Sequence, residues 1–272
     1  MENTAILTYT ASSHVGSRSE NQDNFRLNSE KPFFNMPEHC EFSGEYTGEG
    51  LQVFGVCDGM GGEAMGEVAS MSALDSLERS LQELSEEEKN TLPLEEILLR
   101  GMQLGQKDLR GFYQLIRRTG GTTITLLAVR GKEYHVMNLG DSPAFLLREG
   151  ILKELSVQHS MALYKKEMEL PVQEGDQHIL LRFLGMAEGD IETLVSHVGG
   201  TLQDGDCFLL CSDGIPKGCK LLEIRQMLEE GADADALVQK AIQVEYADNC
   251  TAIVIRWKEK EEEAEHEGES TV

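Results

Sequence analysis

Residues 51–62 read LQVFGVCDGMGG, a mostly apolar run that ends at Asp58 and is followed by a cluster of glycines. A short continuous apolar run bounded by turn residues is typical of a buried strand. A glycine beside an acidic residue lets the backbone approach a ligand closely and offer its own carbonyl oxygen. The stretch therefore predicts a buried strand that carries an acidic side chain at its end.

Helices and groups of strands surround this strand in the sequence. Apolar residues at helical spacing predict helices over 63–84, 93–116 and 234–244. Apolar runs separated by glycines predict the remaining strands, at residues 6–10, 122–129, 133–139, 144–147, 151–154, 207–211 and 251–257. We expect irregular structure in the more polar segments, at residues 12–24, 28–50 and 85–91, and a loop or lid at 158–205. This order of elements predicts an α+β fold, with helices packed on antiparallel sheets.

Acidic side chains recur at the ends of the predicted strands. Asp58 and Asp213 each follow a buried run, Asp141 follows another strand, Asp248 precedes the final strand and Asp23 lies in the polar segment near the N-terminus. A single Asp-Gly pair is ordinary turn chemistry. Several carboxylates that converge at strand ends, however, are the ligands that Mg²⁺ and Mn²⁺ prefer. The combination therefore favours a metal site.

Composition excludes several classes of function. The chain has 272 residues, with 24 Lys and Arg against 48 Asp and Glu, for a net charge of −24. Nucleic acids and anionic membrane surfaces attract clustered basic residues, so we expect neither as a partner. The N-terminus lacks the features of a signal peptide, and no run approaches about 18 apolar residues. Most of the six cysteines lie in apolar runs, as reduced buried thiols do, so we expect a cytoplasmic protein.

The histidines are scattered along the sequence. An isolated histidine needs partners to become a metal ligand. We therefore interpret five of them as structural or surface residues: His14, His135, His159, His178 and His197.

A series of short motifs spans residues 16–251. They are GSRSENQD at 16–23, VCDGMGG at 56–62, GEVAS at 66–70, GGTT at 120–123, NLGDS at 138–142, QHS at 158–160, LRFLG at 181–185, SDG at 212–214 and DNCT at 248–251. In these motifs and their order the chain resembles the metal-dependent protein phosphatases of the 2C family, particularly the bacterial members. The resemblance implies a four-layer α/β/β/α sandwich of two antiparallel sheets flanked by helices. It gives a phosphatase domain at 1–257, followed by an acidic tail at 258–272 that we expect to be disordered.

The resemblance also implies a centre of two Mg²⁺ or Mn²⁺ ions. Asp58 would bridge both ions, with the Gly59 carbonyl on the second. Asp213 and Asp248 would hold the first ion, and Asp23 belongs to the same set of metal residues.

Arg18 would grip the substrate phosphate, which makes Arg18 and Asp58 the expected catalytic residues. The implied activity is hydrolysis of phosphoserine and phosphothreonine in proteins by a metal-activated water. We expect the substrates to be products of a Ser/Thr kinase, and the enzyme to act as a monomer. Two alternatives stay open: a degenerate member that binds phosphoproteins or a kinase with low turnover, and a hydrolase of small phosphoesters.

The chain departs from the family pattern at four positions. Gln22 stands where Glu is common, Met60 where animal relatives carry His, and Pro143 where Arg is usual. Lys217 stands where many relatives have an acid that, with the equivalent of Asp141, binds a third metal. We expect Gln22 and Asp141 to order water or to contribute to such a site. We expect Lys217 to pair with Asp141, so that two ions bind and not three.

Overall fold

The computed structural model describes residues 5–28, 36–61 and 65–259. Its strands form two sheets in which neighbouring strands are antiparallel. The first sheet has the order β3 (His39–Thr47), β1 (Ile6–His14), β12 (Cys250–Lys258), β11 (Cys207–Cys211), β8 (Ala144–Arg148) and β9 (Ile151–Glu154). The second has the order β10 (Ser196–Thr201), β7 (Glu133–Leu139), β6 (Ile124–Arg130), β4 (Gln52–Met60) and β2 (Asp23–Leu27), and β5 (Gly121–Thr122) pairs with β4.

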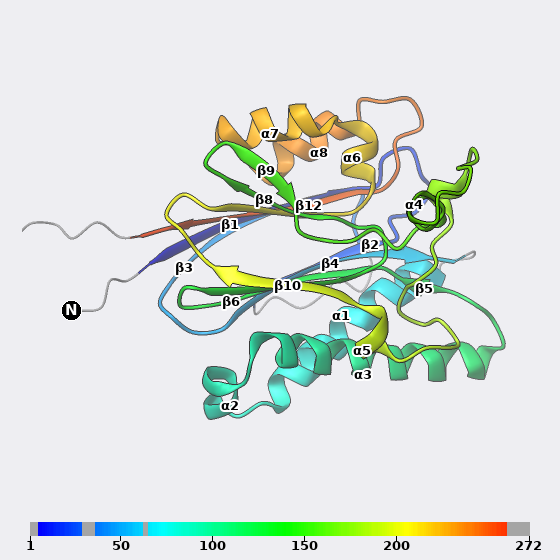
Figure 1. Ribbon diagram of the computed structural model, residues 1–272, viewed down its shortest axis with the longest axis horizontal. Helices are drawn as coiled ribbons and strands as arrows, with labels where there is room; N and C mark the ends of the chain where they lie inside the picture. The colour runs from blue at the N-terminus through cyan, green and yellow to red at the C-terminus, as the bar shows by residue number, and fades with distance from the viewer. Residues whose placement is uncertain (1–4, 29–35, 62–64, 260–272) are drawn as a thin grey trace, which may run out of the picture.

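Helices cover the outer face of each sheet, which makes four layers (Figure 1). The second sheet carries α1 (Met65–Glu83), α2 (Glu86–Thr91), α3 (Leu94–Ile116) and α5 (Ile191–Leu194). The first sheet carries α6 (Gly214–Gly218), α7 (Leu221–Glu229) and α8 (Ala234–Ala241). The segment between β9 and α5 contains α4 (Met161–Glu167) and the short 3₁₀ helix Asp176–His178. The predicted four-layer α+β sandwich is confirmed.

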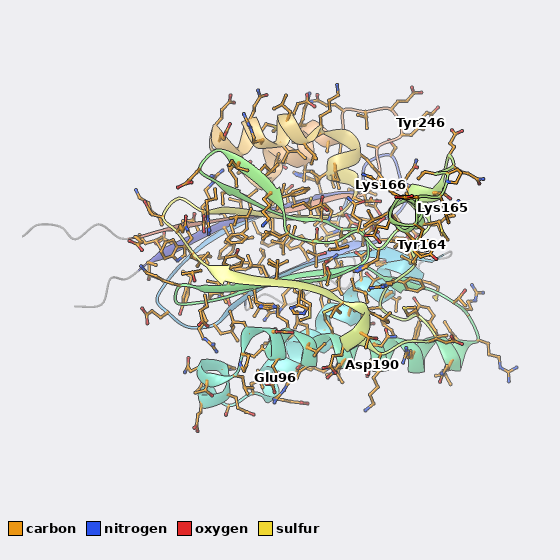
Figure 2. The ribbon with its side chains drawn as sticks, in the orientation of Figure 1. Glu96, Tyr164, Lys165, Lys166, Asp190 and Tyr246 are labelled. Atoms are coloured by element: carbon orange, nitrogen blue, oxygen red, sulfur yellow. The ribbon has the colours of Figure 1, made fainter. Side chains whose placement is uncertain are left out.

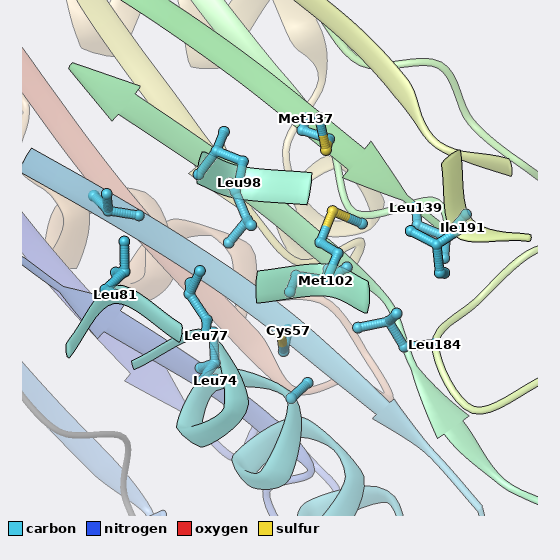
Figure 3. Packing of buried hydrophobic residues seen from close by; sticks show 14 of the residues in the cluster. Cys57, Leu74, Leu77, Leu81, Leu98, Met102, Met137, Leu139, Leu184 and Ile191 are labelled. Atoms are coloured by element: carbon cyan, nitrogen blue, oxygen red, sulfur yellow. The ribbon is translucent and has the colours of Figure 1, made fainter. Parts of the chain in front are cut away.

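The decisive strand, β4, is buried on both faces because it lies between two hydrophobic cores. Successive side chains of a strand point to opposite faces. Phe54 and Val56 therefore face the core between the sheets, whereas Val53 and Cys57 face the core under α1 and α3 (Figure 3). This double burial is the reason why residues 53–57 are apolar without interruption.

Several segments predicted as irregular are regular. Within 28–50, β3 forms at the edge of the first sheet, where its mostly exposed and polar side chains give no strand signal. Within 12–24, β1 continues to His14 and β2 begins at Asp23. Residues 86–91 form α2, which a capping box between Ser85 and Glu88 starts.

The end of the chain falls partly outside the described residues. The last strand runs to Lys258, one residue beyond its predicted end, and the Glu259 amide donates a hydrogen bond to Asp204. The rest of the expected acidic tail, residues 260–272, lies outside the described residues. No helix in the described part of the chain is long and apolar enough to cross a membrane.

Candidate active site

A cavity of about 870 Å³ lies at one end of the sandwich, and its lining is strongly acidic. Tyr246, which lines it, marks this end of the molecule in Figure 2. The acids in the lining are Glu20, Asp58, Asp141, Asp213, Glu245 and Asp248. The predicted strand-end aspartates therefore come together around one space, with the exception of Asp23.

Each of the four aspartates reaches the cavity from the end of a strand. Asp58 lies near the end of β4, and Asp141 follows β7, so both come from the second sheet. Asp213 follows β11 and Asp248 precedes β12, so both come from the first sheet. The stacking of the two sheets thus brings together residues that are up to 190 positions apart (248 − 58).

Asp23 lies beneath the cavity and is fully buried. It faces Asp58 in the register of β2 and β4. The Ser212 hydroxyl donates a hydrogen bond of 2.6 Å to its Oδ2, while its buried Oδ1 has no hydrogen-bond partner among the described residues. Burial raises the pKa of Asp23 to about 7, and the bond from Ser212 partly opposes this rise.

The acidic cluster is electrostatically costly without a cation. Burial raises the pKa of Asp58 well above its usual range, and the charges of the neighbouring aspartates raise it further. Burial also raises the pKa of Asp141 to about 7, with the charge of Asp213 acting in the same direction. A bound divalent cation would relieve this repulsion.

The oxygen donors present fit hard divalent cations. Carboxylates and a backbone carbonyl are the ligands that Mg²⁺ and Mn²⁺ take. At Gly59 the backbone is packed so closely that a Cβ would lie 2.0 Å from the Gly66 carbonyl oxygen and 2.7 Å from that of Gln22. A side chain would therefore not fit at Gly59, and the role of its carbonyl as a metal ligand stays a prediction. The unpartnered Oδ1 of Asp23 adds a further oxygen below Asp58.

Lys217 does not pair with Asp141, and that prediction is wrong. Its ammonium lies 2.5 Å from Oδ2 of Asp213 and 3.0 Å from Oδ2 of Asp248. The short helix α6 causes this contact, because it turns Lys217 back over Asp213 four residues earlier. The ammonium thus bridges the two carboxylates that the family resemblance assigns to the first ion.

Arg18 lies at the rim of the cavity, with 61% of its side chain exposed. Its Nε donates a hydrogen bond of 2.8 Å to Oδ1 of Asp248. Burial alone would raise the pKa of Asp248. The hydrogen bond from Arg18 and the charge of the nearby Lys217 ammonium outweigh this effect and lower the pKa. Asp248 is therefore held as a carboxylate between two cations.

Asn249 fixes the Arg18 loop, a role that sequence reasoning missed. Its side-chain amide donates to the carbonyls of Val15 and Glu20, and its Oδ1 accepts from the Gln22 amide. The loop also approaches the neighbouring chain so closely that a Cβ at Gly16 would lie 2.0 Å from the Asp248 carbonyl oxygen. In the sequence, the only indication of this role is that Asn249 belongs to the DNCT motif.

Two other residues position the acids and were not assigned a role from the sequence. The Thr123 hydroxyl accepts a hydrogen bond from the Asp58 amide. His159 Nδ1 accepts from the Gly140 amide at 3.0 Å, next to Asp141. Burial lowers the pKa of His159 to about 4, so its ring is a neutral acceptor here. The expected structural role of His159 agrees with these contacts.

Gln22 lies at the cavity wall but binds the backbone. Its Nε2 donates a hydrogen bond of 3.3 Å to the Gly61 carbonyl oxygen. The amide thereby supports the glycine turn that follows Asp58, and its role toward water or metal stays a prediction.

Comparisons with known proteins identify the family of this chain. A family model described as protein phosphatase 2C matches residues 42–257. A serine/threonine phosphatase, stp, from Listeria monocytogenes is 30% identical over 214 residues, which cover 74% of this chain and 82% of that protein. The solved structure of PppA, titled a key regulatory component of T6SS in Pseudomonas aeruginosa, superposes with a TM-score of 0.71 at 29% identity, covering 92% of this chain and 97% of that one.

A further structure shares the fold at lower identity. It is the catalytic domain of the phosphatase PstP in complex with two manganese ions, with a TM-score of 0.73 at 23% identity over 94% of this chain and 100% of that one. The family model and the Listeria relative together cover most of the described sandwich. The chain therefore belongs to the protein phosphatase 2C family.

Proposed function

We propose that this chain is a metal-dependent phosphatase that hydrolyses phosphoserine and phosphothreonine in protein substrates. One observation carries the proposal: Asp58, Asp141, Asp213 and Asp248 line a single open cavity, with Arg18 at its rim. A cluster of carboxylates suits cation binding, and a guanidinium beside it suits an anionic substrate. Family membership adds the reaction class.

Two Mg²⁺ or Mn²⁺ ions would be held by Asp58, the Gly59 carbonyl, Asp213 and Asp248, with Asp23 supporting Asp58 from below. Two divalent ions bound at such a site lower the pKa of a shared water and stabilise the attacking and leaving oxygens. The donors of this chain do not distinguish Mg²⁺ from Mn²⁺, since both prefer oxygen ligands. Asp141 would accept hydrogen bonds from water in the same cavity, and the Gln22 side-chain amide would donate hydrogen bonds to it.

Arg18 would bind and orient the phosphate group. Its side chain is more than half exposed, so the planar guanidinium can reach a substrate outside the cavity. A guanidinium can donate two parallel hydrogen bonds to two phosphate oxygens. The bond from its Nε to Asp248 would aim this donor fork at the acidic centre.

The cysteines argue against a mechanism that proceeds through a phosphocysteine. Burial raises the pKa of the Cys57 and Cys211 thiols, which disfavours the reactive thiolate. Among the described residues that line the cavity, none is a cysteine. The substrate would therefore not be attacked by a cysteine, and we propose water as the nucleophile.

A second candidate is a binding protein with low turnover. Lys217 favours it, because its ammonium bridges Asp213 and Asp248 and competes with a cation there. Such a protein would bind phosphoproteins, or a kinase, through Arg18 and the cavity. We further propose that the protein acts as a monomer in the cytoplasm, on substrates of a Ser/Thr kinase.

The test is release of phosphate from phosphothreonine and phosphotyrosine peptides with and without Mn²⁺. We expect Mn²⁺-dependent hydrolysis of the phosphothreonine peptide, and its loss by at least about 100-fold in Asp58→Asn. The matched control is Asp75→Asn, which removes an exposed aspartate of α1. Wild-type rates in Asp58→Asn would contradict the proposed site. Phosphopeptide binding without turnover would favour the second candidate.

A further inference from the structure

Two histidines and a glutamate come together where α3 meets the edge of the second sheet. His135 lies on β7, His197 on the edge strand β10 and Glu95 in the first turn of α3. One ligand atom from each residue lies within 4.8 Å of the other two. None of the three is among the described residues that line the catalytic cavity.

This cluster lies well away from the catalytic aspartates. His135 precedes Asp141 by six residues along β7 and its exit, or roughly 20 Å of extended chain. Figure 2 shows Glu96, the neighbour of Glu95, on the lower helical layer, whereas Tyr246 marks the cavity at the opposite end of the view. The cluster is therefore a separate feature of the molecule.

The pairing of β7 with β10 fixes the two histidines beside each other. His197 is opposite Met137 and Gly199 is opposite His135, so the histidines are diagonal neighbours on one face of the sheet. Their rings stack, with centroids 5.5 Å apart and an interplanar angle of 17°. Gly199 makes room for this arrangement, because a Cβ there would lie 2.7 Å from His135 Nδ1.

The cluster has unused bonding capacity. Nε2 of His135 is buried and has no hydrogen-bond partner among the described residues. A buried polar atom in this state carries a free-energy cost that a suitable ligand would remove. Burial also lowers the pKa of His135, which keeps the ring in the neutral form that binds metals. A ligand that accepts an imidazole lone pair would satisfy this nitrogen.

We propose that Glu95, His135 and His197 form a binding site for Zn²⁺. Two imidazoles and one carboxylate, with a fourth position left for water, are a ligand set that Zn²⁺ takes. The ligand atoms of a tetrahedral Zn²⁺ lie roughly 3.3 Å apart, and Nε2 of His197 is 3.4 Å from Oε1 of Glu95. Both of these side chains are 46% exposed, so the fourth position faces solvent. The ion would tie the edge strand β10 to β7 and α3.

A second cluster of similar composition serves as a control. His39, Glu41 and Asp235 also bring ligand atoms within 4.8 Å of one another. Here, however, Nε2 of His39 is already 2.9 Å from Oδ1 of Asp235, an oxygen that also accepts a hydrogen bond from Ser12. Nε2 of His39 therefore has a hydrogen-bond partner, and this cluster has no buried unpartnered nitrogen in the described part of the chain.

The experiment uses the full chain freed of metal, with Co²⁺ as a spectroscopic probe and Zn²⁺ in competition with a chromophoric chelator. Four-coordinate Co²⁺ with nitrogen ligands absorbs visible light far more strongly than six-coordinate Co²⁺ with oxygen ligands. We expect this band in the wild type, in His39→Gln and in Asp58→Asn. We expect it to be lost in His197→Gln and Glu95→Gln, with Zn²⁺ affinity lowered by at least about tenfold.

Thermal stability provides an independent readout. Zn²⁺ bound only to the folded state raises Tm, so Zn²⁺ should raise Tm less in His197→Gln than in the wild type, and the same difference should persist when both proteins also carry Asp58→Asn. His197 and Glu95 are chosen because they are half exposed, and phosphatase activity should be unchanged in both variants. A wild type that shows no band at saturating Co²⁺ would overturn the proposal. So would a band that persists in His197→Gln and Glu95→Gln, or one that disappears in Asp58→Asn.

Discussion

At the scale of single residues, Lys217 alters the site most. The Lys217 ammonium bridges Asp213 and Asp248, although 38% of its side chain is exposed. A divalent ion that needs the same carboxylates must displace this ammonium. At the proposed metal site, Lys217 would therefore lower cation affinity without removing any ligand.

Replacing Lys217 by Met tests this competition. The side chain keeps its length and loses its charge, so we expect Mn²⁺ to bind about tenfold more tightly, which corresponds to about 1.4 kcal/mol. Titration of the metal-free protein with Mn²⁺, followed by calorimetry, measures the change. Lys220→Met is the matched control, because Lys220 is an exposed lysine three residues further on. Equal Mn²⁺ affinities in Lys217→Met and Lys220→Met would show that displacing the Lys217 ammonium costs no free energy.

Arg18 makes a different contribution, since it lies at the cavity rim and contacts Asp248, which we propose as a metal ligand. We expect Arg18→Ala to lower kcat/KM for a phosphothreonine peptide by roughly 10–100-fold, the range for a lost hydrogen bond to a charged group. The loss should lie mainly in KM, because the assigned role is binding of the ground state. Arg117→Ala, at the exposed C-terminal end of α3, should leave both constants unchanged. A loss confined to kcat would instead assign Arg18 to the transition state.

At the scale of elements, the contact between α1 and α3 holds the helical layer on the second sheet. Leu74 and Leu77 of α1 and Leu98 and Met102 of α3 share one buried core (Figure 3). Gly101 lets the two helices approach, because a Cβ at this position would lie 2.4 Å from Cδ1 and 3.3 Å from Cα of Leu77. Gly101, within the predicted helix 93–116, thus has a packing reason.

Two glycines of α3 give a matched pair for this argument. Gly101→Ala should destabilise the protein by about 1–3 kcal/mol, because the added methyl overpacks the helix contact. Gly111→Ala should stabilise it by about 0.5–1 kcal/mol, because a Cβ there meets no atom within 4 Å and alanine favours the helix. Urea unfolding of both variants measures the difference. Stabilisation by both substitutions would refute the close approach of α1 and α3.

At the scale of the whole molecule, the two sheets carry acids to one end, and this concentration of charge ties stability to pH. Burial raises the pKa of Asp23 and of Asp141 to about 7 in the folded protein. In the unfolded chain both titrate near about 3.9. The folded state therefore binds more protons, so the stability from these groups is complete below about pH 4 and is lost as pH rises to about 7.

We therefore expect Tm in the presence of a chelator to fall between about pH 5 and pH 7.5. Asp141→Asn should flatten this dependence, because the amide does not ionise, and Mn²⁺ should reduce it by neutralising the cluster. Differential scanning calorimetry at a series of pH values measures the change of Tm with pH. The control variant Asp75→Asn should show the same pH dependence as the wild type. A Tm that rises over this range in the metal-free protein would contradict the raised pKa values.

The sequence by itself determined the α+β class and the central parts of the site. The run at 51–58 predicts β4 because burial on both faces leaves a local signature, and the acids at strand ends follow from the same runs. It did not determine β3, whose exposed polar residues give no such signature. Helix α2 was also missed, because its capping box looks like an ordinary charged turn.

Only the tertiary structure decided which side chains meet. Lys217 pairs with Asp213 and Asp248, and not with Asp141, because the short helix α6 turns it toward the first sheet. His135 and His197, scattered in the sequence, become neighbours through the register of β7 and β10. Pairing and register depend on the packing of distant segments, and a one-residue shift would move each side chain to the opposite face. No local pattern contains that information.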